Sequence, residues 1–268
     1  MGTQKYRLTE NHINIGNRIL YQIEALKDFG NVKAGDLGGY IESEENLSQY
    51  DNAWVYGDAW VFDNARVYGN ACVFGDAWVF DNALVYDNAL VYDDAEVYGD
   101  AQVYDDAEVY GDAKVFGSAE VYGDAKVFDD AEVYDDAKVF DNAEVYDDAE
   151  VYGDAQVYGS AKVYDDAEVY GDAKVYGDAE VYGDAKVYGD AEIESTKDYI
   201  VFKNWWSSGR YFTWTRSNNM WKVGCFYGTG EELIKKAYND SKESGREYER
   251  VVRYVEEILE ENYENKEN

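Results

Sequence analysis

Hydrophobic and polar positions follow a strict six-residue period over half of the chain. An alanine recurs at every sixth position from Ala53 to Ala191, which gives 24 units of the general form Ala-x-Val-aromatic-Gly/Asp-Asp/Asn. Four residues that alternate in this way are typical of a short β-strand, with Ala and Val on one face and x and the aromatic residue on the other. Most x positions hold Glu, Lys or Gln, so we expect the Ala/Val face to point inward.

The last two positions of each unit are typical of a tight corner. The fifth position is Gly or Asp, and the sixth is mostly Asp or Asn. Glycine adopts a positive φ freely, whereas Asp and Asn tolerate it and can hydrogen-bond to nearby backbone. The chain contains no proline that would interrupt strand pairing. The pattern therefore predicts short strands joined by two-residue corners.

This strict repeat resembles the hexapeptide repeats of left-handed parallel β-helices. The resemblance implies three units, about 18 residues, in each triangular turn, and hence about eight turns over residues 53–194. In that register opposite charges alternate down one face, which is favourable between adjacent strands. The residues of this face are Glu108, Lys126, Glu144, Lys162 and Glu180. Another face is less regular and stacks Glu132, Glu150 and Glu168.

The aromatic positions are predicted to stack in the same register. One outward ladder would contain Tyr92, Tyr110, Phe128, Tyr146, Tyr164 and Tyr182. In a structural interpretation, these rings cover the neighbouring turn and shield its backbone hydrogen bonds. In a functional interpretation, they form a surface for a partner. The structural interpretation is favoured, because every turn has the feature.

Residues 1–52 are predicted to form an N-terminal β cap and the degenerate first coils of the β-helix, because the first turn of a parallel β-helix would otherwise expose unpaired strand edges. We expect strands at Lys5–Leu8 and Arg18–Ala25, around a turn at Gly16 and Asn17. The segment ALKDF at residues 25–29 is followed by VKAGDLGGYI at residues 32–41. Both segments resemble the opening of bacterial and phage-borne hexapeptide-repeat proteins related to YdcK. The resemblance covers about residues 5–60 and the repeat, and it implies a fold and a bacterial or phage origin, without an established enzymatic activity.

Residues 195–268 differ in composition and are predicted to form a small α+β domain at the other end. The expected elements are strands at Tyr199–Trp205, Arg210–Arg216 and Met220–Tyr227, and helices at Gly230–Asp240 and Arg246–Glu261. Thr229 is the expected N-cap of the first helix.

The strands of this domain carry a mixture of tryptophan and basic residues. The set consists of Trp205, Trp206, Arg210, Trp214, Arg216, Trp221 and Lys222. Such residues could stack on and clamp a nucleotide or a single strand, so a ligand-sequestering module is one hypothesis. The alternative is a tryptophan-rich core whose basic residues face the acidic β-helix.

The formal net charge of −33 argues against direct binding to nucleic acid or to an anionic membrane, since both would repel it. No signal-like segment opens the chain, and no apolar run approaches membrane-spanning length. Cys72 and Cys225 fit no metal or redox spacing, which is typical of reduced thiols in a cytoplasmic protein.

Known enzymes of this fold depend on histidine, and His12 is the only histidine in the chain. Acyltransferases use a catalytic His between subunits, and related carbonic anhydrases need three His ligands for zinc. The aspartates are evenly spaced and do not indicate a carboxylate pair. We therefore expect no enzymatic activity, no cofactor and no metal site, apart from weak cation binding between stacked aspartates.

The main functional hypothesis rests on the acidity of the repeat region. Residues 53–193 have a net charge of −28, or one charge per ~1.4 Å of axis, compared with ~1.7 Å in duplex DNA. One corner would carry an unbroken ladder of Asp58, Asp76, Asp94, Asp112, Asp130, Asp148, Asp166 and Asp184. The hypothesis is an accessory protein that mimics DNA and binds a host DNA-binding or defence protein. The alternative is a structural scaffold whose acidity only keeps it soluble.

The early x positions are apolar where later ones are charged. They hold Trp54, Trp60, Cys72, Trp78, Leu84 and Leu90. An apolar patch of this size marks a covered surface. We expect the N-terminal cap, or a second subunit in a homodimer, to pack there.

Overall fold

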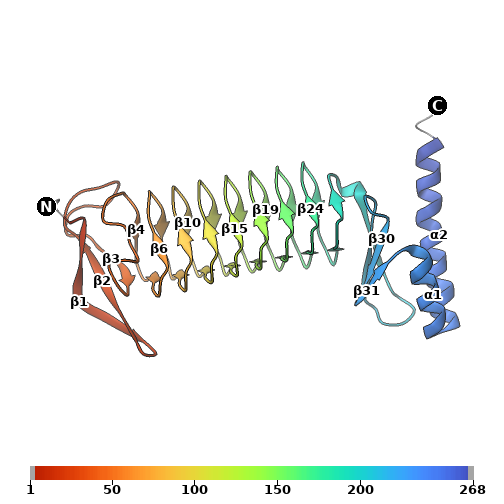
Figure 1. Ribbon diagram of the computed structural model, residues 1–268, viewed down its shortest axis with the longest axis horizontal. Coiled ribbons are helices and arrows are strands. Elements are labelled where there is room, and N and C mark those ends of the chain that lie inside the picture. The colour runs from red at the N-terminus through yellow and green to blue at the C-terminus, as the bar shows by residue number, and fades with distance from the viewer. Residues whose placement is uncertain (1–3, 265–268) are drawn as a thin grey trace.

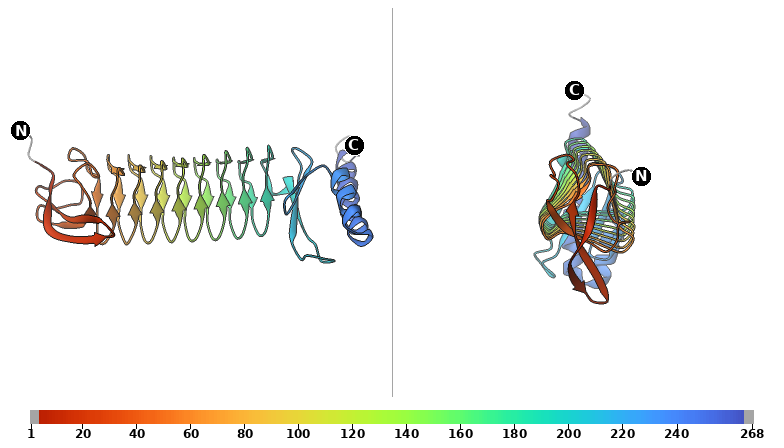
Figure 2. Two further views of the ribbon diagram at one scale, coloured as in Figure 1. Left: turned by 60° about the horizontal axis from the view of Figure 1, so that its bottom comes forward. Right: turned by 90° about the vertical axis from the view of Figure 1, so that its left-hand side faces the viewer.

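The computed structural model describes residues 4–264, with side chains to residue 260. It is a mainly β structure in which a parallel β-solenoid lies between two end structures (Figure 1). Seen along the axis, the turns lie behind one another (Figure 2). This confirms the parallel β-helix that the six-residue period predicts. No helix in the described part of the chain is long and apolar enough to cross a membrane.

The N-terminal cap consists of a hairpin and one further strand. β1 (Tyr6–Ile15) and β2 (Arg18–Ala25) are antiparallel and turn at Gly16, whose φ is +56°. The first strand is longer than predicted, and the hairpin projects beyond the side of the solenoid (Figure 1). β2 also pairs with β3 (Leu37–Ile41), which in turn pairs in parallel with β5 (Trp60–Val61).

The solenoid strands β4 to β27 follow at six-residue intervals, one for each unit. Each contains the x residue and the residue after it, from Trp54–Val55 in β4 to Glu192–Ile193 in β27. Strands 18 residues apart pair in parallel, as Glu108 does with Lys126, which confirms the predicted register. Every third strand therefore lies on the same side. We call the three sides the β4 face, the β5 face and the β6 face, after the first regular strand of each, the last being β6 (Arg66–Val67).

The solenoid has about nine turns, of which the 24 regular units form eight, as predicted. The additional turn comes from β3 and from Leu47, which forms a parallel bridge to Val67. Leu47 and Val55 are eight positions apart instead of six, so two inserted residues in this loop interrupt the period. The alanine pattern therefore begins one turn after the solenoid does.

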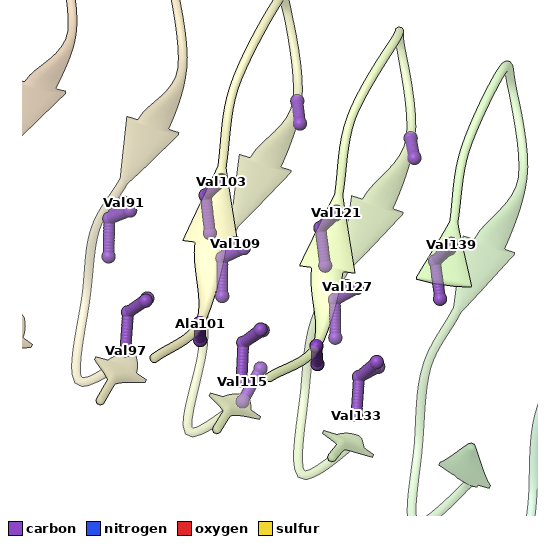
Figure 3. Close-up of a cluster of buried hydrophobic side chains, with 14 of the residues drawn as sticks. Val91, Val97, Ala101, Val103, Val109, Val115, Val121, Val127, Val133 and Val139 are labelled. Carbon is purple, nitrogen blue, oxygen red and sulfur yellow. The ribbon is translucent and has the colours of Figure 1, made fainter. Parts of the chain in front are cut away.

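The core of the solenoid is a narrow stack of alanine and valine. From Ala53 to Ala191 these alanines and valines are buried, and the valine side chains point inward in successive turns (Figure 3). The backbone N–H groups donate to the next turn, as Glu108 N does to Ala125 O at 3.0 Å. At the corners, ten aspartates in the fifth position have φ between 56° and 59°, as the Gly/Asp pattern predicts.

The C-terminal domain has four strands instead of the three that were predicted. They are β28 (Tyr199–Lys203), β29 (Tyr211–Thr215), β30 (Met220–Val223) and β31 (Phe226–Gly228), antiparallel in that order. The predicted third strand is divided because Gly224, with a φ of +54°, turns the chain. A short 3-10 helix, η1 (Thr196–Asp198), precedes the sheet.

Two helices complete the domain, α1 (Gly230–Asp240) and α2 (Lys242–Glu264). The second begins four residues before its predicted start. Thr229 is the N-cap of α1, as predicted, and its backbone N–H donates to the Glu232 carboxylate at 2.9 Å.

Side chains satisfy the open backbone groups at both ends of the solenoid. At the last turn, the N–H groups of Tyr182, Lys186 and Glu192 donate to the hydroxyls of Tyr199, Thr213 and Ser217. At the first turn, the buried Lys5 Nζ donates to Ala53 O at 2.7 Å. Burial lowers the pKa of Lys5 to about 8, although Asp51 opposes the shift. Both strand edges are therefore covered.

Candidate interaction surface

The predicted aspartate ladder lies along one corner of the solenoid, between the β4 and β5 faces. We call this corner the ladder corner, and its sixth positions hold Asp58, Asp76, Asp94, Asp112, Asp130, Asp148, Asp166 and Asp184. The first seven side chains are exposed and Asp184 is half-buried. Asp93, Asp129, Asp147 and Asp165 occupy the fifth position of the same corner. This corner thus holds twelve of the 26 solenoid aspartates, against eight and six at the other two.

The other two corners interrupt their aspartates with asparagine and serine. Asn64 donates to Asn82 at 3.0 Å, and Asn82 donates to Asp100 at 2.9 Å. A matching chain runs from Asn70 through Asn88 at the third corner. Among the side chains described, to residue 260, the eight sixth-position aspartates of the ladder corner have neither an ion pair nor a hydrogen bond.

Six lysine–glutamate ion pairs lie on the flat faces, in contrast to the ladder corner. On the β4 face Lys126 lies 3.1 Å from Glu108, and Lys162 lies 2.7 Å from Glu144. The predicted alternation of charge on this face is thus confirmed. The less favourable stack of Glu132, Glu150 and Glu168 is also present, on the β5 face. Lys114 and Lys186 pair with its two end members.

The aromatic ladders form as predicted. Along the β4 face, ring centroids from Tyr92 to Tyr164 are 4.8–5.0 Å apart and the rings are nearly parallel. Some tyrosine hydroxyls donate to a glutamate of the next turn, as Tyr92 does to Glu108 at 2.9 Å. The rings are half-buried and stack on one another, which favours the structural interpretation of these residues.

A groove lies beside the ladder corner, between the hairpin and the β5 face. Its volume is about 610 Å³. Its acidic side consists of Asp58, Asp76, Asp94 and Asp112, and its remaining lining residues are Ile13, Tyr40, Trp60, Trp78 and Glu96. Trp60 and Trp78 stack with centroids 4.6 Å apart, at an interplanar angle of 16°. The aspartate ladder and the early tryptophans are separate features of the sequence. In the structure they lie side by side in this groove.

A comparison with family models matches residues 65–81 to the YdcK beta solenoid repeat. The matched segment lies in the early turns of the solenoid and includes Trp78. The match and the parallel solenoid agree with each other. The chain has a YdcK-related β-solenoid fold. A comparison with curated proteins finds no match.

The early apolar residues of the YdcK-related solenoid do not form one patch. Trp54 is fully buried beneath the N-terminal cap, where Tyr6 and Phe29 pack edge-on against it. The others are distributed over all three faces. Cys72 and Leu90 lie on the β4 face, Trp60 and Trp78 on the β5 face, and Leu84 on the β6 face. Of the residues for which a single covered surface is predicted, the cap therefore fully buries only Trp54, whereas Trp60 and Trp78 lie at its edge.

The basic and tryptophan residues of the C-terminal domain do not converge on one surface. Trp214 and Trp221 are buried against the helices, in a cluster with Leu233 and Val252. Lys222 points to the other side of the sheet, where its Nζ lies 4.6 Å from the ring centroid of Tyr188.

The remaining members of that set are dispersed as well. Trp205 is 75% exposed, Trp206 packs edge-on against Tyr248, and Arg216 pairs with Asp198. Arg210 is exposed beside a small pocket of about 210 Å³ next to α1. This arrangement fits a hydrophobic core and an end cap better than a ligand clamp.

The remaining candidates for chemistry lie apart from one another. His12 is exposed in the hairpin, with its Nδ1 3.0 Å from Glu10 O. Cys72 is half-buried and Cys225 is exposed, and burial raises the pKa of the Cys72 thiol. Across residues 4–264, no three His, Cys, Asp or Glu side chains are arranged to hold a metal ion.

Two lining residues of the groove could not be predicted from the sequence. Ile13 belongs to the hairpin and Tyr40 to β3, so neither follows the six-residue period. Tyr40 does lie within the string of residues 32–41 that resembles YdcK-related proteins, which is the one signal that marks it in the sequence.

Proposed function

We propose that this protein is a non-catalytic binding protein of a bacterial or phage-infected cytoplasm. Its ladder corner occupies the DNA-binding surface of another protein, as a mimic of one DNA strand. The observation that carries this proposal is the unbroken row of eight aspartates that have no hydrogen-bond or ion-pair partner in the protein. The neighbouring corners contain asparagine at equivalent positions, so this kind of corner does not require aspartate.

The linear charge density of the ladder corner supports the proposal. Eight turns at ~4.8 Å give a corner about 38 Å long, so its twelve aspartates present one charge per ~3.2 Å. A single strand of duplex DNA presents one charge per ~3.4 Å of helix axis. A protein surface that follows a phosphate backbone would therefore meet a similar density of negative charge along this corner.

The rigidity of the corner supports it as well. Backbone hydrogen bonds fix each turn to the next, as Asp94 N donates to Gly111 O at 3.0 Å. Short aspartate side chains on a fixed backbone lose little conformational freedom when a partner binds. Because the charges are already close together, a basic partner also relieves their mutual repulsion.

Displacement of a bound DNA duplex tests the proposal. A partner is captured from a bacterial lysate, bound to labelled duplex DNA and titrated with this protein, and release of the DNA is followed by fluorescence anisotropy. We expect complete release at low salt, with an affinity that falls as salt rises, because counterions compete for the ladder. A captured partner that keeps its DNA when this protein is bound would contradict the proposal.

A further inference from the structure

The groove beside the ladder corner combines exposed indole surface with carboxylates and contains no basic lining residue. Trp78 is 36% exposed although it stacks on Trp60. Later turns carry Glu96, Lys114 and Glu132 at the equivalent position of this face, so the fold does not need an aromatic residue there. The tryptophan pair is therefore a local departure from the repeat.

The lining of the groove defines the chemistry of an occupant. Carboxylates along one side repel anionic ligands and attract a cation. An indole ring binds a cation over its face, and it does so better than the other aromatic rings. An arginine guanidinium suits both features, because it stacks on aromatic rings and donates in a planar fork to carboxylates.

The length of the groove indicates an extended segment as the occupant. Its acidic side runs from Asp58 to Asp112, three successive steps of the solenoid or about 14 Å. An extended chain covers that distance with about four residues. Ile13 and Tyr40 provide apolar surface near the hairpin, against which the aliphatic parts of such a segment can pack.

We propose that this groove binds an arginine-bearing, extended segment of a protein partner. The guanidinium lies against Trp78 and hydrogen-bonds to the carboxylates of Asp76 or Asp94. The inference rests on the proposed function, because the groove shares four aspartates with the ladder corner. It adds an anchor point, since binding energy in protein interfaces concentrates at buried aromatic and arginine contacts.

Three short peptides that alternate glycine with arginine, lysine or glutamate serve as probes, with binding measured by titration calorimetry at low salt. We expect the arginine peptide to bind about 3- to 10-fold more tightly than the lysine peptide, and the glutamate peptide not to bind. Equal affinities of the arginine and lysine peptides would overturn the inference, since they would indicate attraction by charge alone.

Substitution of Trp78 tests the anchor directly. Trp78→Gln should weaken binding of the arginine peptide about 10-fold. The fold should persist, because Gln102 and Gln156 already occupy equivalent positions on the β6 face. Leu84→Gln is the matched control, since it removes an apolar early residue outside the groove, and it should leave the affinity unchanged. Circular dichroism checks both folds.

The outcomes separate this inference from the proposed function. If Trp78→Gln binds the arginine peptide as tightly as the unmodified protein, the groove is not an arginine site, whatever the ladder corner does. If Trp78→Gln weakens peptide binding but the unmodified protein displaces no partner from DNA, the groove inference stands and the proposed function fails.

Discussion

At the scale of single residues, the tyrosine ladders link the fold to its surface charge. Burial, followed by neighbouring tyrosines and carboxylates, raises the pKa of Tyr86 and Tyr164 to about 12. Tyr92 and Tyr134 are shifted in the same direction by burial and by hydrogen bonds to Glu108 and Glu150. These hydroxyls are therefore expected to stay protonated at pH values where a free tyrosine ionises.

The raised pKa values predict a loss of stability in alkaline solution. An unfolded tyrosine ionises near pH 10, so above that pH the unfolded chain loses protons that the folded chain retains. The contribution of these tyrosines to the free energy of unfolding should be complete below about pH 10 and should disappear as the pH passes about 12. Tyrosinate absorbance and denaturant midpoints measure both effects.

Replacing Tyr92 and Tyr164 by phenylalanine provides the control for this titration. Phe128 already occupies an equivalent ladder position, so the fold should persist while the alkaline loss becomes smaller. Tyrosines that all ionise near pH 10 in the intact protein would refute the account of these residues.

Residue positions with the same sequence signal can have different environments. Trp54, Trp60 and Trp78 occupy the same place in their units, and the period predicts that all three point outward. Trp54 is nevertheless fully buried, because Tyr6 and Phe29 of the cap lie over the first turn only. The period describes the solenoid, whereas the packing of the cap is decided by contacts between segments distant in sequence.

At the scale of elements, side chains take up open backbone groups at both ends of the solenoid, while β1, β2 and β3 continue the sheet of the β5 face at the N-terminal end. Thr213 is buried and accepts a hydrogen bond from Lys186 N at 2.8 Å. Thr213→Val keeps the shape of the side chain but leaves this N–H without a partner. We expect a loss of about 1–3 kcal/mol in the free energy of unfolding, and faster amide exchange at Lys186.

Ser118→Ala is the control for this end-cap prediction, because it removes a hydroxyl at an exposed corner. It should change the free energy of unfolding by less than about 0.5 kcal/mol. Equal stability and equal amide exchange in the Thr213→Val variant and the unmodified protein would show that this hydroxyl does not close the edge.

Element boundaries follow from the sequence only where the pattern is regular. The 24 solenoid strands, their register and the N-cap at Thr229 are all predicted correctly. The degenerate first coil before residue 53 is expected, but its strands are not placed from the sequence because two inserted residues after Leu47 break the period. The fourth C-terminal strand is missed because the turn at Gly224 interrupts an otherwise continuous hydrophobic segment.

At the scale of the whole molecule, negative charge is concentrated along one straight edge of a rigid solenoid. The ladder corner could be predicted from the sequence, because it depends only on the period and on three units per turn. The groove could not, because Ile13 reaches it from a hairpin whose position relative to the β5 face is set by packing. The two together define the candidate surface.

The most direct test of the central claim compares two variants of equal charge. The first carries Asp94→Asn, Asp112→Asn, Asp130→Asn and Asp148→Asn at the ladder corner. The second carries Asp100→Asn, Asp136→Asn, Asp154→Asn and Asp172→Asn at the corner between the β5 and β6 faces. Both should fold, since Asn64, Asn82 and Asn88 already occupy such positions.

The measurement is the affinity of each variant for the captured partner at low salt. If the ladder corner mimics DNA, the first variant should bind about 10-fold or more weakly, while the second should change by less than about 3-fold. A ladder variant that binds as tightly as the unmodified protein, or two variants weakened to the same extent, would contradict the account.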